Sequence, residues 1–239
     1  MSDDFIFRGA LADVDEAVQR IIDREEARQA ATIILIASES EAPEAVTEAL
    51  GSGFGNIYAE GYPREESRRQ SEADITDIDM ELAHYRRYSD PRYYKGVENA
   101  DIIEALARRR AAELFAANGI AADNLYVNVQ PLSGAPANSA VYSALLQPGD
   151  TIMGLNLNDG GHLTHGSPVN RSGKVYKGVP YFVDPETEVL NYDEIERIAL
   201  ASKPQIIVAG YSAYPKIIDW RRFREIADKV GAYLLADIA

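Results

Sequence analysis

The spacing of apolar residues near the start of the chain predicts two helices. Hydrophobic side chains from Val14 to Ile22 recur at i, i+3, i+4, i+7 and i+8, which forms one stripe of an amphipathic helix running to about Arg28. A second helix is predicted over Glu44–Leu50, because a proline precedes it and the glycines from Gly51 onward end it.

Residues 64–91 differ from the rest of the chain in charge. Thirteen of these 28 residues are acidic or basic, which places the stretch at the surface. Apolar residues from Ile75 to Tyr85 nevertheless form a partial helical stripe, so the pattern predicts an exposed helix rather than a disordered linker. A long helix is predicted next, from about Asn99 to Ala117.

After residue 120 the chain alternates between short apolar runs and amphipathic stretches. The runs predict strands, and the stretches predict helices. The predicted strands are 125–129, 151–155, 174–176, 181–183, 205–209 and 233–236, and the predicted helices are 135–147, 192–202 and 220–230. This alternation is typical of a mainly parallel α/β sheet, in which ligands bind beyond the carboxyl ends of the strands.

Charge and composition exclude several classes of function. The 239 residues include 24 Lys and Arg against 38 Asp and Glu, a net charge of −14, which argues against nucleic acid or an anionic membrane as a partner. With no cysteine and three histidines, thiol chemistry is excluded and no metal site is expected. The chain has neither an apolar run that could span a membrane nor a basic signal-peptide start, so the expected location is the cytoplasm.

Polar residues follow several predicted strands, where chemistry is expected. Ser133-Gly134 precedes a helix, and its amides and hydroxyl suit a phosphate, although an ordinary serine cap has the same pattern. His162 and His165 lie in a glycine-rich loop, where they could equally be hydrogen-bonded structural residues. Asp237 ends the last strand, and its carboxylate needs a cationic partner such as a protonated pyridine nitrogen, an arginine or a helix N-terminus.

Seven short motifs, taken together and in order, resemble the serine hydroxymethyltransferase family, which interconverts serine and glycine with pyridoxal phosphate and tetrahydrofolate. They are Leu35-Ile-Ala-Ser-Glu-Ser40, Tyr58-Ala-Glu-Gly-Tyr-Pro63, Arg92-Tyr-Tyr94, Gln130-Pro-Leu-Ser-Gly-Ala-Pro-Ala-Asn138, Gly160-Gly-His-Leu-Thr-His-Gly-Ser-Pro-Val-Asn170, Tyr211-Ser-Ala-Tyr214 and Ala236-Asp-Ile-Ala239. Each motif alone is weak, whereas seven in family order are specific. The resemblance implies the α/β fold called pyridoxal-phosphate fold-type I, which is aspartate-aminotransferase-like.

The resemblance implies how the cofactor pyridoxal phosphate would be held. His162 would stack on its pyridine ring, and Asp237 would pair with the protonated ring nitrogen, which keeps the ring able to accept electrons. Ser212 would lie near the phenolic oxygen. The implied cofactor-binding residues are Tyr58, Ser133, Gly134, Ala135, His162, Ser212 and Asp237.

The resemblance also implies a second set of residues for serine, glycine and the cosubstrate tetrahydrofolate. Glu60 would manage the proton on the serine hydroxyl or on the folate. Tyr58, Glu60 and Tyr94 would reach the neighbouring subunit's site in an obligate homodimer. The implied substrate-binding residues are Ser38, Glu60, Tyr93, Tyr94, Leu157, Gly161 and Leu163. The implied catalytic residues are Tyr58, Glu60, His162 and Asp237.

The chain departs from the family pattern in several places. Ala135 stands where a second serine is usual, so one phosphate hydrogen bond worth about 1–3 kcal/mol is missing or is supplied by another group. Ser40 stands where asparagine is usual. Residues 64–91 separate two motifs that only a couple of residues join in the common family form, so we expect a surface insertion in a long variant.

The family's Schiff-base lysine and carboxylate-binding arginine have no counterpart before Ala239. We therefore expect the N-terminal half of an enzyme, with a helical arm over residues 1–50 and the first part of an incomplete large domain over 51–239. A partner chain could supply the C-terminal half and its lysine.

Two other functions fit part of the pattern. A different fold-type I aldolase or transaminase could share the phosphate turn and Asp237, but it would not explain the Tyr58–Pro63 and His162–His165 motifs. A non-catalytic subunit that binds the cofactor or serves assembly would need only half a site.

Overall fold

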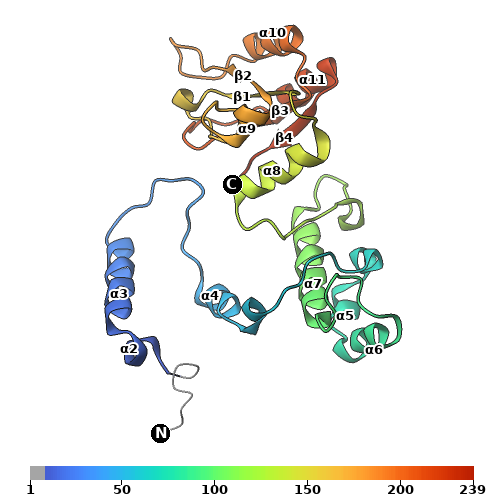
Figure 1. Ribbon diagram of the computed structural model, residues 1–239. Helices are drawn as coiled ribbons and strands as arrows, with labels where there is room; N and C mark the ends of the chain where they lie inside the picture. The colour runs from blue at the N-terminus through green and yellow to red at the C-terminus, as the bar shows by residue number, and fades with distance from the viewer. Residues whose placement is uncertain (1–8) are drawn as a thin grey trace. The chain divides into compact units, whose positions relative to one another are not determined.

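Four parallel strands form a sheet in the C-terminal part of the chain (Figure 1). The structure is a computed structural model that describes residues 9–239. The sheet belongs to one of two compact units. Within the described residues this unit comprises 9–41 together with Leu146–Ala239, and the other unit is Ala42–Leu145. This division differs from the sequence-based boundary at residue 50.

The strands lie in the order β2-β1-β3-β4, and each neighbouring pair is parallel, as the alternating pattern predicted. Leu155 pairs with Tyr181, and Ile152 pairs with Ile206. Every residue of the two central strands, β1 and β3, is buried, which is typical of parallel strands covered on both faces. The strands are β1 (Thr151–Leu155), β2 (Lys177–Tyr181), β3 (Ile206–Ala209) and β4 (Tyr233–Ala236).

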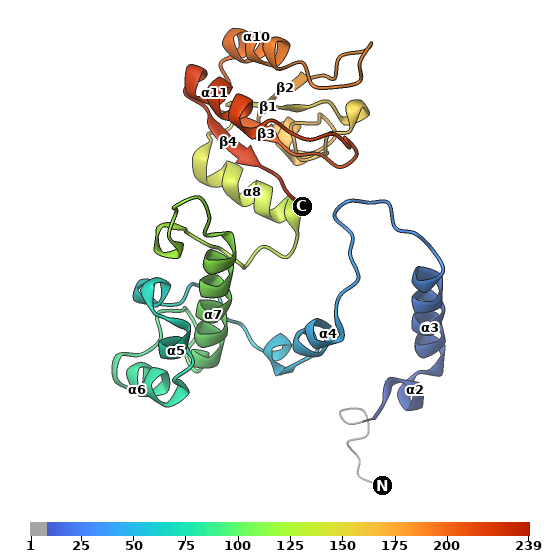
Figure 2. The same ribbon diagram turned by 180° about the vertical axis from the view of Figure 1, so that it is seen from behind.

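Two helices, α10 (Tyr192–Ser202) and α11 (Trp220–Val230), pack side by side on one face of this sheet, as Figures 1 and 2 show. Alternate strand residues, including Met153 and Ile207, join Ile195 of α10 and Phe223 of α11 in one buried cluster. This period of two is what a pleated strand imposes. Asn191 and Asp219 cap the two helices by accepting from backbone N–H groups, so both helices begin where the sequence pattern placed them.

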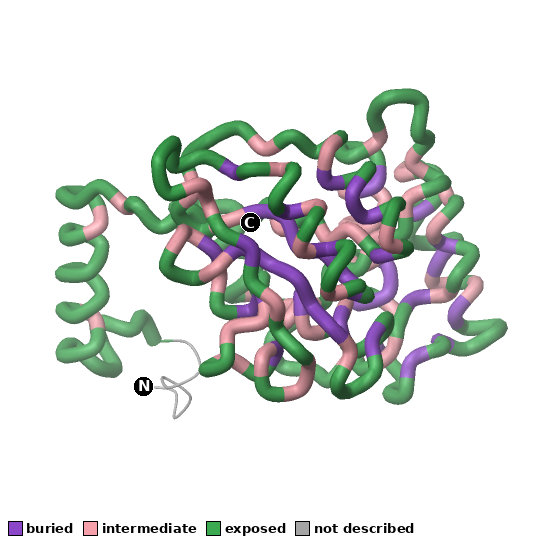
Figure 3. The backbone as a smooth tube through the Cα atoms, turned by 90° about the horizontal axis from the view of Figure 1, so that it is seen from above, coloured by how far each residue is buried: buried purple, intermediate pink, exposed green. Residues whose placement is uncertain are grey.

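The N-terminal helices α2 (Leu11–Val14) and α3 (Glu16–Ala30) have no buried residue (Figure 3). Asp15 caps α3 by accepting from the Val18 N–H at 3.1 Å. The predicted amphipathic helix is therefore confirmed, but its apolar stripe is uncovered, and Ile21 is 68% exposed.

The second unit is helical, and its segment 64–91 is only partly exposed. Ile75 and Tyr85 are buried against Ile102 and Ala105 of α7, so the prediction of an exposed helix is wrong for one face of the segment. The elements of this unit are α4 (Glu44–Leu50), η1 (Gly53–Asn56), η2 (Glu65–Arg69), α5 (Glu72–Ile75), α6 (Ile78–Tyr88), α7 (Glu98–Phe115), η3 (Ala122–Asn124) and α8 (Gly134–Leu145).

Three predicted strands are wrong in whole or in part. Residues 125–129 alternate as a strand does but pair with no strand in the part of the chain that the structure describes. Residues 174–176 lie at the end of α9 (Arg171–Val175), because the Asn170 side chain caps a helix there. The strand predicted at 181–183 is instead β2, which ends at Tyr181 and tolerates Pro180 because β2 is an edge strand.

Candidate functional site

Asp237 follows β4, and its carboxylate is paired with a buried histidine. The Asp237 Oδ2 atom lies 2.9 Å from Nε2 of His165. The His165 side chain is 1% exposed and that of Asp237 is 15% exposed, so the imidazole is enclosed while the carboxylate is partly exposed. Nδ1 of His165 is buried and has no hydrogen-bond partner within residues 9–239. An unpaired N–H would be costly, which favours the tautomer that carries the proton on Nε2 and donates it to Asp237.

Two glycines make room for this pair. A Cβ atom at Gly154 would lie 2.8 Å from the His165 Cβ, closer than side chains approach one another. Gly210 has a φ of +119°, and a Cβ atom there would overlap the backbone carbonyl oxygen of Asp237. The backbone N–H of Asp237 also donates to the Ala209 carbonyl at 2.8 Å. These close approaches fix the carboxylate at the carboxyl edge of the sheet.

His162 lies beside the pair, with its ring centroid 5.6 Å from that of His165. The Thr164 N–H donates to Nδ1 of His162 at 3.2 Å, so this nitrogen is an acceptor and its lone pair is in use. Burial, followed by the nearby His165, lowers the pKa of His162 from its ordinary value of 6.5. A neutral imidazole at physiological pH suits stacking on a flat ring better than a cation does.

The loops after β1 and β3 are joined at the same edge of the sheet. The Gly160 carbonyl accepts from the backbone N–H groups of Ser212 at 2.9 Å and Ala213 at 3.1 Å. A Cβ atom at Gly161 would overlap the Leu155 carbonyl, so glycine is required for this turn. A cavity of about 380 Å³ opens beside the turn, and its lining includes Leu157, His162 and His165.

The structure thus gathers six of the predicted site residues around the carboxyl edge of the sheet: Leu157, Gly161, His162, Leu163, Ser212 and Asp237. Ser38 belongs to the same unit and is an exposed residue between α3 and α4. His165 was not among the predicted site residues, and its contact with Asp237 fits the alternative of a hydrogen-bonded structural histidine. The available signal was its place three residues after His162 in the same motif.

The second unit gathers the remaining predicted site residues in two places. Tyr58 and Tyr94 stack with their ring centroids 5.7 Å apart, and the Tyr93 N–H donates to the Glu60 carbonyl at 3.1 Å. All four side chains are exposed. Ser133, Gly134 and Ala135 lie at the N-terminus of α8 and are exposed, as the predicted phosphate turn requires.

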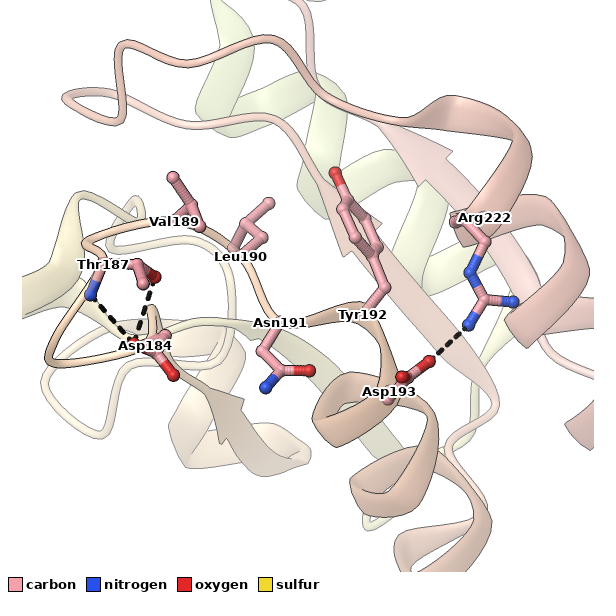
Figure 4. A pocket seen from close by; sticks show the side chains of 8 residues that line it. All are labelled: Asp184, Thr187, Val189, Leu190, Asn191, Tyr192, Asp193 and Arg222. Atoms are coloured by element: carbon pink, nitrogen blue, oxygen red, sulfur yellow. Dashed lines mark hydrogen bonds and ion pairs between the residues drawn. The ribbon is translucent and has the colours of Figure 1, made fainter.

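Another pocket of about 470 Å³, shown in Figure 4, contains none of the predicted site residues. Its polar groups already have partners, because Asp184 accepts from the Thr187 backbone and hydroxyl and Arg222 pairs with Asp193 at 3.0 Å. These contacts account for the pocket as ordinary turn and surface structure.

No helix within residues 9–239 is long and apolar enough to cross a membrane. No group of three or more His, Cys, Asp or Glu residues in that range is arranged to hold a metal ion.

Known proteins resemble this chain along nearly its whole length. A sequence model of the family described as serine hydroxymethyltransferase matches residues 11–87 and 83–239. The chain belongs to the serine hydroxymethyltransferase family. It is 49% identical over 230 residues to the serine hydroxymethyltransferases of Acinetobacter radioresistens and Acinetobacter baylyi, in each case over 96% of this chain and 47% of the relative. It is 47% identical over 234 residues to a probable serine hydroxymethyltransferase of Rickettsia bellii, over 98% of this chain and 48% of that protein.

The chain spans about half the length of these curated serine hydroxymethyltransferases. The family assignment made from seven motifs is therefore confirmed, as is an α/β architecture with a parallel sheet. The roles that the family resemblance gives to individual residues stay predictions.

Proposed function

We propose that this chain is part of an enzyme that interconverts serine and glycine, with pyridoxal phosphate as cofactor and tetrahydrofolate as one-carbon acceptor. The observation that carries the proposal is the Asp237–His165 pair, which lies beside His162 at the carboxyl edge of a parallel sheet. Membership of the serine hydroxymethyltransferase family supports it, and with it a sheet of pyridoxal-phosphate fold-type I.

The residues at this edge fit the cofactor. Asp237 offers a partly exposed carboxylate, which accepts a hydrogen bond from His165. An anion at this place would hold the proton on the cofactor's ring nitrogen. His162, held neutral and anchored at Nδ1, would present its ring face for stacking. When bound, the cofactor supplies an electron-accepting ring that weakens bonds to the substrate α-carbon.

The start of α8 would bind the cofactor's phosphate. α8 has 12 residues, and the first-turn N–H groups at its N-terminus attract an anion together with the aligned peptide dipoles. The Ser133 hydroxyl would add one further donor, whereas Ala135 has none to offer.

Tyr58, Glu60, Tyr93 and Tyr94 would serve the substrates. Their exposed side chains lie on two adjoining segments, 58–60 and 93–94. This arrangement supports a surface that acts in the site of a second copy in a homodimer. Glu60 would hold or move the proton of the serine hydroxyl. The folate would contact Tyr93, together with Leu157, Gly161 and Leu163 of the loop after β1. The Schiff-base lysine would come from the half of the relatives' length that this chain does not cover.

The test is to supply the purified full-length protein that carries this sequence with isotope-labelled serine and to measure labelled glycine. Glycine formation should require both pyridoxal phosphate and tetrahydrofolate. Amino transfer to a 2-oxo acid, or aldol cleavage at the same rate without folate, would instead indicate another fold-type I enzyme. A protein that binds the cofactor and converts no amino acid would indicate a binding or assembly subunit.

A further inference from the structure

Arg92 is a buried arginine that joins α7 to the loop that carries Glu60. Its side chain is 2% exposed. Nε donates to Asp101 Oδ1 at 2.6 Å, and Nη2 donates to Glu104 Oε2 at 2.6 Å, so two carboxylates of α7 bind one guanidinium. The remaining nitrogen, Nη1, donates to the backbone carbonyls of Ala59 and, at 3.2 Å, of Gly61.

Three consecutive carbonyls of this loop are held from outside it. The Glu60 carbonyl accepts from the Tyr93 N–H at 3.1 Å, between the two carbonyls that Arg92 binds. Nε2 of Gln130 donates to the Gly61 carbonyl at 2.8 Å and to Glu104 Oε1 at 3.0 Å. The backbone on both sides of Glu60 is therefore fixed, although the Glu60 side chain itself is exposed.

The loop also packs closely against the arginine. Gly61 has a φ of +114°, and a Cβ atom there would lie 3.1 Å from the Arg92 Cα. Lysine could not replace Arg92, because one ammonium group cannot reach the two carboxylates and two carbonyls that the planar guanidinium binds. Functional side chains are held in position by hydrogen bonds from surrounding residues, and the backbone that carries the exposed Glu60 carboxylate is held in this way.

We propose that Arg92 and Gln130 are positioning residues that set the direction of the Glu60 carboxylate. This inference rests on the proposed function, in which Glu60 handles the proton of the substrate. Gln130 has a second consequence, because it stands three residues before Ser133 and so ties the Glu60 loop to the segment that leads into the phosphate turn.

The experiment uses the full-length protein at saturating cofactor. Gln130→Ala should lower kcat for folate-dependent serine cleavage about 10-fold, the effect of losing one well-placed hydrogen-bonding side chain, and Arg92→Lys should lower it further. The matched control is Gln70→Ala, which removes a similar bond from Gln70 Nε2 to Glu81 Oε1 at 2.8 Å. It also removes the bond that Gln70 Oε1 accepts from Arg64 at 3.2 Å, and it has no hydrogen bond to residues 59–61. The control should retain the parent kcat.

A double-mutant cycle separates positioning from general destabilisation. If Gln130 acts through Glu60, Gln130→Ala should cause no further loss in a Glu60→Gln background. The positioning role would be overturned, with the proposed function left intact, if Gln130→Ala lowered kcat equally in the Glu60 and Glu60→Gln backgrounds. A Gln130→Ala variant as active as Gln70→Ala would have the same meaning. A fully active Glu60→Gln variant would overturn the proposed role of Glu60 and this inference with it. Because Gln130→Ala removes one uncharged side chain, the test holds even where Arg92→Lys fails to fold.

Discussion

Tyr181→Phe should destabilise the unit that contains the sheet, solely because the Tyr181 hydroxyl is lost. The Tyr181 hydroxyl is buried at the end of β2, where it donates to the Val208 carbonyl at 2.8 Å and lies 3.0 Å from the Tyr211 hydroxyl. Burial raises the pKa of Tyr181 well above its usual range, so the hydroxyl keeps its proton as a donor. Phenylalanine preserves the ring packing against Phe223, whose centroid lies 5.8 Å away, but it removes one hydrogen-bond partner from the buried Val208 carbonyl and one from the partly buried Tyr211 hydroxyl.

The expected cost follows from that loss. A buried polar atom left unpaired costs about 1–3 kcal/mol. For a chain of this size, each kcal/mol lowers Tm by about 2–4 °C. Because Tyr211 precedes Ser212 directly, the change should also loosen the loop that the proposed cofactor site uses.

Urea unfolding followed by tryptophan fluorescence gives the measurement. Trp220 is the chain's single tryptophan, and it begins α11 in the same unit as Tyr181, so its signal reports that unit. Tyr233→Phe is the control, since Tyr233 is 55% exposed on β4 and its change should cost less than about 0.5 kcal/mol. Equal midpoints and slopes for the two variants would refute the hydrogen-bond reasoning.

Three further predictions concern the site. Burial holds the pKa of His162 below 6.5, so the unfolded chain binds this proton more readily than the folded chain, and stability falls as the pH drops below about that value. In unfolding followed by Trp220 fluorescence, His162→Gln should lose less stability over that pH range than the parent does, and equal losses would contradict the predicted sign. Inactive Glu60→Ala and Asp237→Ala full-length proteins should regain partial activity as mixed dimers, whereas proven mixed dimers without activity would place both residues in one subunit's site. After borohydride reduction with pyridoxal phosphate, mass spectrometry should find no stoichiometric adduct on the six lysines of residues 1–239, and one such adduct accompanied by folate-dependent turnover would contradict an external lysine.

The elements that local sequence determines were predicted best. α10, α11 and β4 have the predicted bounds, because capping side chains at Asn191 and Asp219 and the αL glycine Gly231 mark their ends in the sequence itself. The strands near residues 125 and 175 were predicted poorly, because pairing depends on a partner that no local pattern reveals.

The candidate residues of the site were named from the sequence, but the contacts among them were not predicted. Family motifs pointed to Asp237 and His162, yet the contact of Asp237 with His165 joins positions 72 residues apart. The Arg92 cluster was missed for a related reason. Asp101 and Glu104 read as ordinary charged positions on a helix, and only the fold turns them inward onto one guanidinium.

The most direct test of the central claim is the serine cleavage rate of the full-length Asp237→Ala variant at saturating pyridoxal phosphate and tetrahydrofolate. Loss of the anion beside the ring nitrogen should lower kcat by about 100-fold or more, because transition-state charge is no longer stabilised there. Asp184→Ala, which removes a partly exposed turn carboxylate outside the candidate site, should retain the parent rate. Near-normal turnover by Asp237→Ala would contradict the assignment of this carboxylate and the site built around it.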